Sequence, residues 1–209
     1  LILDNNPNVS RSAATALKNI KYMKDNIWFK NKLSILLENK NLTANAKGEL
    51  LISYASLFKF KLDSLVTEFS GQIEPKFIYR LLAENTHDWE FNFDYLNDQI
   101  SKSSEIELLD LLPAYLALQN KFLNNTEYLT NLLTILNSNM PSSVSIVADG
   151  LKTPIIHQNK EVLQEVILNQ IFDNKNNPQF SETIISLANL SYKIDRIFYD
   201  SVIDILSKS

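Results

Sequence analysis

Two histidines, His87 and His157, are the side chains of this chain best suited to proton transfer or metal binding near neutral pH. His87 follows Glu84 at a Glu-x-x-His spacing, which on a helix places both side chains on one face. Bundle proteins that hold two metal ions use this motif twice, together with two further inward glutamates. His157 has Pro154 three residues before it, so the second half of such a site is missing. The sequence therefore predicts no metal and no other cofactor, and a solvated histidine at a helix end.

A second arrangement joins His87 to Arg80. The two form an Arg-x6-His pair, which resembles the signature of HEPN ribonucleases over these residues alone. The resemblance implies an all-helical fold and metal-free RNA cleavage near a dimer cleft, with Arg80 steadying the phosphate and His87 moving a proton. That family often has a polar residue directly after the arginine, whereas this chain has Leu81. We keep this ribonuclease activity as the alternative functional interpretation.

An aromatic group lies close to these residues in the sequence. Its members are Tyr79, Trp89, Phe91, Phe93 and Tyr95. Beside Arg80, which can pair a ligand carboxylate through two hydrogen bonds, such a group is able to line a small-molecule pocket. The candidate ligand-binding residues are therefore Tyr79, Arg80, Trp89 and Phe93. The competing interpretation is core packing, which is the commoner role of clustered aromatic residues.

The sequence contains no motif for other kinds of catalytic site. There is no cysteine, which excludes disulfides, thiolate metal sites and a cysteine nucleophile. A Gly-x-Ser-x-Gly elbow and a glycine-rich phosphate loop are also missing. The lack of cysteine favours an extracytoplasmic, periplasmic location, with the cytoplasm as the alternative.

The charge pattern disfavours two classes of partner. The formal net charge is −4, and lysine and arginine are scattered rather than gathered in a run. Nucleic acids and anionic membranes both require clustered cations, so we expect neither as a partner. No apolar run reaches the roughly 18–20 residues that cross a bilayer. The chain begins with Leu1–Leu3 and no methionine. We hypothesise that these residues trail a membrane or signal segment lying outside the chain.

Composition predicts the fold class. Only 3 glycines occur, whereas sheet proteins need glycine at tight turns. Hydrophobic content is 45% and charged content 21%, as in ordinary globular proteins. We expect an all-α fold, an antiparallel bundle of about 7–8 helices that can form two stacked sub-bundles. One domain would span 1–209, with 1–101 and 102–209 as possible sub-modules.

Hydrophobic spacing of three and four predicts the individual helices. We expect a long, bent helix over 10–39, a continuous helix through Leu51 to Phe69, and a third over Pro75–Glu84. In residues 88–97 aromatic and polar residues alternate, which is typical of a strand. The candidate partner strand is Val144–Val147, followed by Asp149-Gly150, a dipeptide that favours a hairpin turn. We prefer a helix over 88–101, with Gly150 at the end of another helix.

The stretch Ser104–Asn139 is apolar enough to lie in the middle of the bundle. Ser104 and Glu107 form a capping box at its start, and Pro113 should kink or split the helix. The last helix begins at Asn177-Pro178 and keeps an apolar stripe to Ile205. So regular a stripe suits helix pairing, and we expect a homodimer through this helix.

These observations favour a non-enzymatic helical sensor or protein-interaction domain, the extracytoplasmic part of a bacterial membrane-associated protein. Its partner would be a small-molecule ligand or another protein. In gross layout the chain is similar to the all-helical ligand-binding regions of bacterial receptors, although no motif carries that similarity.

Overall fold

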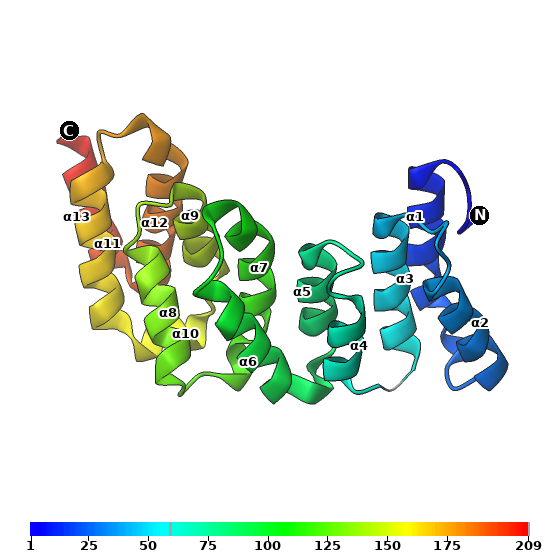
Figure 1. Ribbon diagram of the computed structural model, residues 1–209. Helices are drawn as coiled ribbons and strands as arrows, with labels where there is room; N and C mark the ends of the chain where they lie inside the picture. The colour runs from blue at the N-terminus through cyan, green and yellow to red at the C-terminus, as the bar shows by residue number, and fades with distance from the viewer. Residues whose placement is uncertain (59, 209) are drawn as a thin grey trace. The chain divides into compact units, whose positions relative to one another are not determined.

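The computed structural model describes residues 1–58 and 60–208, and its regular structure is helical (Figure 1). In these residues thirteen α-helices and five short 3-10 helices occur, with no strand. The predicted all-α class is confirmed, including the helix expected over 88–101, although the helices are more numerous and shorter than predicted. Within the same residues, none of the helices combines the length and the apolarity needed to cross a bilayer.

The chain forms two compact units, which divide between Tyr95 and Leu96 inside one helix. The boundary predicted between the two sub-modules lies a few residues further along the chain, between residues 101 and 102. The helices of the first unit are α1 (Pro7–Ala16), η1 (Leu17–Asn19), η2 (Lys21–Met23), α2 (Ile27–Leu37), α3 (Ala44–Leu57), α4 (Leu62–Phe69), α5 (Pro75–Glu84), η3 (Thr86–Asp88) and the start of α6 (Trp89–Ile100).

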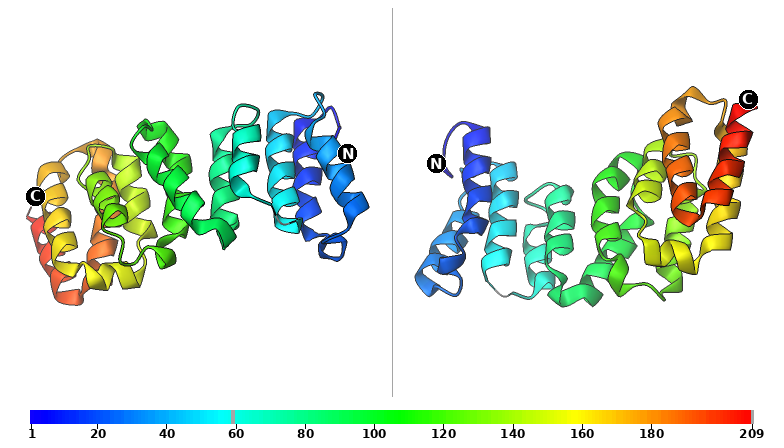
Figure 2. Two further views of the ribbon diagram at one scale, coloured as in Figure 1. Left: turned by 60° about the horizontal axis from the view of Figure 1, so that its bottom comes forward. Right: turned by 180° about the vertical axis from the view of Figure 1, so that it is seen from behind.

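Helix α3 is the centre of the first unit. It packs against α1, α2 and α5, and α1 lies directly beside it in both views of Figure 2. Thr43 caps its first turn by accepting a hydrogen bond from the Ala46 amide. Gly48 lies on the side facing α5, where the ring of Phe77 occupies the place that a Cβ atom would need. Almost the whole circumference of α3 is buried as a result.

Two helices predicted as continuous are broken in the first unit. The helix expected through Leu51 to Phe69 ends at Leu57, because Phe58 adopts an extended backbone, and α4 begins at Leu62. The six apolar residues of its predicted stripe are nevertheless all buried: Leu51, Tyr54, Phe58, Leu62, Leu65 and Phe69. The predicted burial is confirmed, because α3 and α4 each turn an apolar side toward the core.

The helix expected over 10–39 is also divided. After α1 the chain passes through η1 and η2, and α2 starts only at Ile27. Asp25 has a φ of 68°, a left-handed conformation that no helix continues through. Asn26 then caps α2 by accepting a hydrogen bond from the Phe29 amide at 2.9 Å. The stretch predicted as one bent helix is therefore two α-helices, separated by the short helices η1 and η2.

The second unit takes in the rest of α6 and the helices that follow. These are α7 (Glu105–Ala117), η4 (Gln119–Lys121), α8 (Thr126–Leu136), α9 (Pro141–Gly150), α10 (Thr153–Gln158), α11 (Lys160–Asn174), η5 (Pro178–Phe180), α12 (Ser181–Ile194) and α13 (Arg196–Ser207). Helix α9 is packed against α7, α8 and α12, and it ends at Gly150 as predicted.

Helix α7 has the predicted capping box, formed by Ser104 and Glu107. Leu111, Leu112 and Tyr115 are fully buried, but Ile106 in the first turn is 79% exposed. The helix is not split at Pro113, because α7 continues through it to Ala117; the predicted stretch is divided later, between Ala117 and Thr126. Helix α12, rather than α7, has the most helical neighbours in this unit, since it packs against α9, α10, α11 and α13.

The predicted last helix is a hairpin of two helices. The break lies at Asp195, whose backbone is extended and whose side chain caps α13 by accepting a hydrogen bond from the Phe198 amide at 2.7 Å. Asp195 also pairs with Lys160 of α11. The apolar stripe survives the break because α12 and α13 pack against each other along it. Asn177, with Pro178, begins the short helix η5, as its cap residue.

Candidate functional site

Arg80 extends from α5 to a carboxylate on α3. Its Nη1 and Nη2 atoms donate hydrogen bonds to Glu49 at 2.8 and 3.1 Å, and its Nε donates to Glu84 at 2.9 Å. The Glu49 side chain is only 3% exposed, and Arg11 of α1 lies 3.6 Å away on the same carboxylate. The guanidinium of Arg80 therefore joins α5 to α3, and its donors are directed at protein carboxylates.

Electrostatics agree with this ion pair. Burial by itself raises the pKa of the Glu49 carboxyl, but hydrogen bonds from Arg80 and the positive charges of Arg80 and Arg11 outweigh it, so that the pKa lies below its usual value. In turn, the hydrogen bond to Glu49 raises the pKa of Arg80. Both groups are therefore charged over the whole physiological range.

His87 has a different partner. Its Nε2 atom lies 3.3 Å from the carbonyl oxygen of Phe60, and the residue is exposed. The contacts of Arg80 run to α3 and along α5, whereas His87 contacts the backbone after α3, so these contacts do not bring the guanidinium and the imidazole together. Within residues 1–58 and 60–208, no three histidine or acidic side chains are placed to share a metal ion.

Two of the five aromatic residues of the predicted group belong to the core, and the other three are half-buried. Tyr79 and Phe93 are buried, whereas Trp89 is half-buried at the start of α6. Phe91 and Tyr95 contact each other with their ring centroids 6.1 Å apart. This arrangement agrees with the core-packing interpretation of the aromatic group.

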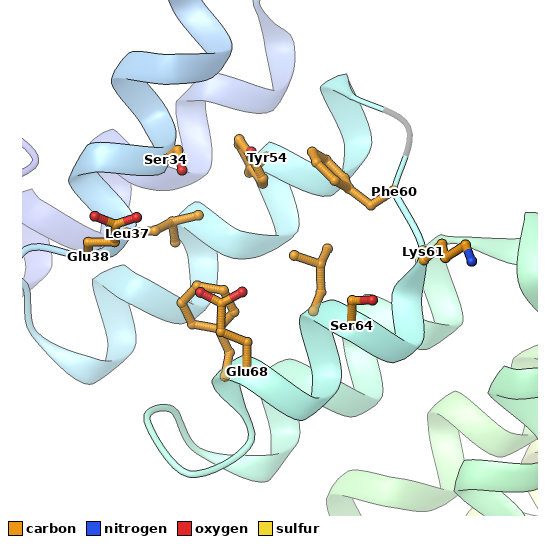
Figure 3. Close-up of a pocket in the computed structure, with 10 residues that line it drawn as sticks. Ser34, Leu37, Glu38, Tyr54, Phe60, Lys61, Ser64 and Glu68 are labelled. Atoms are coloured by element: carbon orange, nitrogen blue, oxygen red, sulfur yellow. The ribbon is translucent and has the colours of Figure 1, made fainter.

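A concave site occurs elsewhere in the first unit, between α2, α3 and α4. Its cavity has a volume of about 480 Å³. The residues that line it are Ser34, Leu37, Glu38, Tyr54, Phe60, Lys61, Ser64, Leu65, Glu68 and Phe69 (Figure 3). Four of them, Leu37, Tyr54, Leu65 and Phe69, are buried and form the inner wall. We call this site the α2–α4 cavity.

The aromatic side of the α2–α4 cavity is formed by Tyr54 and Phe60. Their rings are stacked, with centroids 4.5 Å apart and planes inclined by 23°. Burial raises the pKa of the Tyr54 hydroxyl, and the negative charge of Glu68 raises it further, against a hydrogen bond with Ser34 that lowers it. The hydroxyl is therefore protonated at neutral pH and lies near both Ser34 and Glu68.

Charged side chains stand at the mouth of the α2–α4 cavity. Glu38, Lys61 and Glu68 are all exposed. In Figure 3 the ammonium of Lys61 points away from the centre of the cavity. A further cation, the ammonium of Lys30, lies 4.7 Å from the ring centroid of Phe60. The site thus combines apolar walls, a stacked aromatic pair and two carboxylates.

Sequence reasoning did not find this cavity, since the candidate residues it named lie on α5 and α6. The feature that the sequence prediction overlooked is the end of α3 at Leu57. Read as one helix, Leu51 to Phe69 forms a single packed stripe with no opening. Because α3 ends at Leu57, the chain turns back and brings Phe60 beside Tyr54. Three aromatic residues within seven positions, Tyr54, Phe58 and Phe60, were the available hint.

Comparison with known proteins gives no relative from which a role can be carried over. No family model, curated protein or solved structure matches this chain. The functional argument therefore depends on the geometry of the α2–α4 cavity and on the exposed surfaces.

Proposed function

We propose that this chain is a non-enzymatic helical binding domain of the sensor type, which holds a small organic ligand in the α2–α4 cavity. The observation that carries the proposal is the cavity itself. Its volume of about 480 Å³ falls within the range of ligand sites, and its inner wall is apolar with a few polar groups at the mouth. A site with this composition can bind and orient a ligand without catalysing a reaction.

The alternative ribonuclease interpretation draws no support from the site geometry. Its proposed phosphate-binding group, Arg80, already donates hydrogen bonds to Glu49 and Glu84. Its proposed proton-transfer group, His87, contacts a backbone carbonyl instead. A binding role for the cavity requires no change in either contact.

Small probes test the binding proposal directly. We expect 1-hexanol and hexylammonium, added to isotopically labelled protein, to shift NMR signals of Leu37, Tyr54 and Leu65. A bulky Ser64→Trp substitution at the mouth should block these shifts. Thr67→Trp is the matched control, because Thr67 is also exposed on α4 but does not line the cavity. Probe-induced shifts confined to other parts of the chain, or no shifts at all, would refute the proposal.

A second surface supports self-association. On the α12–α13 hairpin, Ile185, Tyr192 and Ile203 are 62, 63 and 40% exposed, and Tyr192 contacts Tyr199 with ring centroids 5.4 Å apart. Grouped apolar side chains on a surface mark sites of association. We propose that two copies pair through this hairpin, as the predicted dimer through the C-terminal helix requires.

Sedimentation equilibrium tests the dimer. The unaltered chain should sediment as a dimer, and Tyr192→Ser together with Ile185→Ser should shift it to monomer. Ile106→Ser, on the exposed start of α7, is the control and should leave the dimer intact. A monomeric unaltered chain at high concentration would exclude this surface as a dimer contact.

We also propose an extracytoplasmic location, which the lack of cysteine favours. Fractionation of the source cells with an antibody against this chain should recover it outside the cytoplasm. Recovery with cytoplasmic markers would reverse the assignment without affecting the binding proposal.

A further inference from the structure

We infer that the α2–α4 cavity selects an organic ammonium ion, with the apolar body of the ligand inside and the ammonium at the mouth between Glu38 and Glu68. This inference rests on the proposed function, because it names the ligand class of the same cavity. It is carried by the combination of apolar walls, aromatic rings and carboxylates.

The inner wall sets the requirement for an apolar body. Leu37 and Phe69 are 2 and 4% exposed, and Tyr54 and Leu65 are 7% exposed each, so these side chains are fixed by packing. The apolar part of a ligand can cover the small apolar surface that these side chains still expose to the cavity. A hydrocarbon portion removed from water there is stabilised in proportion to the area buried.

The mouth sets the sign of the charge. Glu38 and Glu68 line it, and neither has a salt bridge within the described part of the chain. Among the described residues that line the cavity, Lys61 is the one cation, and its ammonium points away from the cavity (Figure 3), while Lys30 lies against the ring of Phe60. A ligand cation can therefore pair with two carboxylates, whereas a ligand anion would be repelled by both.

The aromatic residues favour the same sign of charge. The face of an aromatic ring attracts cations, and the attraction grows when the cation is partly removed from water. This cluster already holds one ammonium, since Lys30 Nζ lies 4.7 Å from the centroid of Phe60 and 6.0 Å from that of Phe58. Tyr54, stacked on Phe60, continues this aromatic surface into the cavity.

An ammonium ion attached to an apolar body can come from two sources, a free alkyl amine and the lysine side chain of a peptide. Both present a short hydrocarbon chain that ends in a cation. The chemistry at Glu38 and Glu68 would be the same for each. The test therefore includes both sources, and their relative affinities tell them apart.

The decisive experiment compares probes of one chain length on the full chain by calorimetry and NMR. We expect hexylammonium to bind about tenfold more tightly than 1-hexanol, and hexanoate to bind most weakly. Equal binding of hexylammonium and 1-hexanol would overturn the ammonium inference while leaving the proposed ligand cavity standing. Binding of none of the three would overturn both.

Charge-neutral variants locate the ammonium. Glu38→Gln and Glu68→Gln should each weaken hexylammonium several-fold and leave 1-hexanol unchanged. Glu90→Gln, an exposed position that does not line the cavity, is the matched control and should change neither. Loss of hexylammonium binding in the control to the same extent would show a general charge effect and overturn the inference.

The source of the ammonium follows from two further probes, Nα-acetyl-lysine methylamide and its Nε-acetylated form. Tighter binding of the first than of hexylammonium indicates a peptide lysine, and weaker binding indicates a free amine. Either result supports the ammonium inference provided that the Nε-acetylated form, which lacks the charge, binds less well. Equal binding of the two lysine probes overturns it.

Discussion

Arg80 and Glu49 face each other across the α3–α5 interface as a two-pronged ion pair, with Nη1 and Nη2 at 2.8 and 3.1 Å from the two carboxylate oxygens. The carboxylate is nearly inaccessible, whereas the arginine side chain is 36% exposed. Arg11 approaches the same carboxylate from α1. One buried negative charge thus connects three helices of the first unit, and its neutralisation depends on the two arginines.

Removing the arginine should destabilise the first unit strongly. In Arg80→Met, Glu49 would stay buried with only the more distant Arg11 beside it, and an uncompensated buried charge is costly. We expect a loss of about 3 kcal/mol in the free energy of unfolding, measured by urea titration. Glu84→Gln removes the exposed partner of the same guanidinium and should cost less than about 1 kcal/mol. Similar losses for both variants would mean that the ion pair with Glu49 is not the main contribution of Arg80 to stability.

The same ion pair predicts acid sensitivity. The pKa of Glu49 is lowered in the folded chain, so its contribution to stability is complete above the unfolded-state value of about 4.3 and is lost as the pH falls through the folded-state value. The free energy of unfolding should therefore begin to fall below about pH 5 and continue to fall until the pH has passed through the lowered pKa of Glu49. In Glu49→Gln this acid-dependent loss should be smaller, because the titrating group is gone.

Arg80→Met serves as the second variant in the pH series. Without the main group that lowers its pKa, Glu49 should bind a proton at a higher pH, and the fall in stability should begin earlier. Urea titrations of the three proteins across the acid range measure the effect. Superimposable pH profiles would show that Glu49 titrates normally in the folded chain.

The sequence was sufficient for the fold class and for much of the core, because both depend on apolar spacing that is insensitive to where a helix ends. Leu51, Tyr54 and Leu65 were expected to be buried and are buried. Helix ends were harder to predict. Asp195 is unremarkable in the sequence, and its role as the cap that divides the last helix depends on an extended backbone at one residue.

The candidate site was harder still to predict, since it depends on tertiary contacts. Arg80 was expected to pair with a ligand carboxylate, whereas in the structure it pairs with Glu49, 31 positions earlier in the chain, and with Glu84. No local pattern marks that pairing. Phe60 and Tyr54 stack only because the chain reverses between α3 and α4, and that reversal was hidden by a stripe which continues across it.

Gly48 provides a test of the packing between α3 and α5. A Cβ atom at this position would lie 2.2 Å from the ring of Phe77, so Gly48→Ala must displace the ring or the helix. We expect a loss of about 1–3 kcal/mol in the free energy of unfolding, although alanine is the better helix former. Calorimetric melting curves would measure the loss.

Gly71 is the matched control for this substitution. An added Cβ atom there meets nothing within 4 Å, and its φ is not positive. Gly71→Ala should therefore leave stability unchanged, or raise it by about 0.5 kcal/mol because alanine reduces the conformational freedom of the unfolded chain. If Gly48→Ala proves as harmless as Gly71→Ala, the close contact with Phe77 is not present in solution.

Asn92 should be the residue that fixes the end of α5. Its side chain is fully buried, and its Nδ2 atom donates hydrogen bonds to the carbonyl oxygens of Leu82 at 2.8 Å and Asn85 at 2.7 Å. The last carbonyls of a helix lack partners within the helix, so this one amide satisfies two groups at the point where α5 gives way to η3. The link also ties α6 to α5.

Replacing Asn92 by leucine keeps a similar volume and removes both hydrogen bonds. Two buried carbonyl oxygens would lose their donor, and we expect a cost of about 1–3 kcal/mol in the free energy of unfolding. Hydrogen exchange should show faster opening at the end of α5 but not in α3, because the defect is local. Asn92→Asp should cost more at neutral pH, since it places a carboxylate beside the two carbonyl oxygens. Stability equal to that of the unaltered chain in both variants would show that the amide of Asn92 does not hold these helices together.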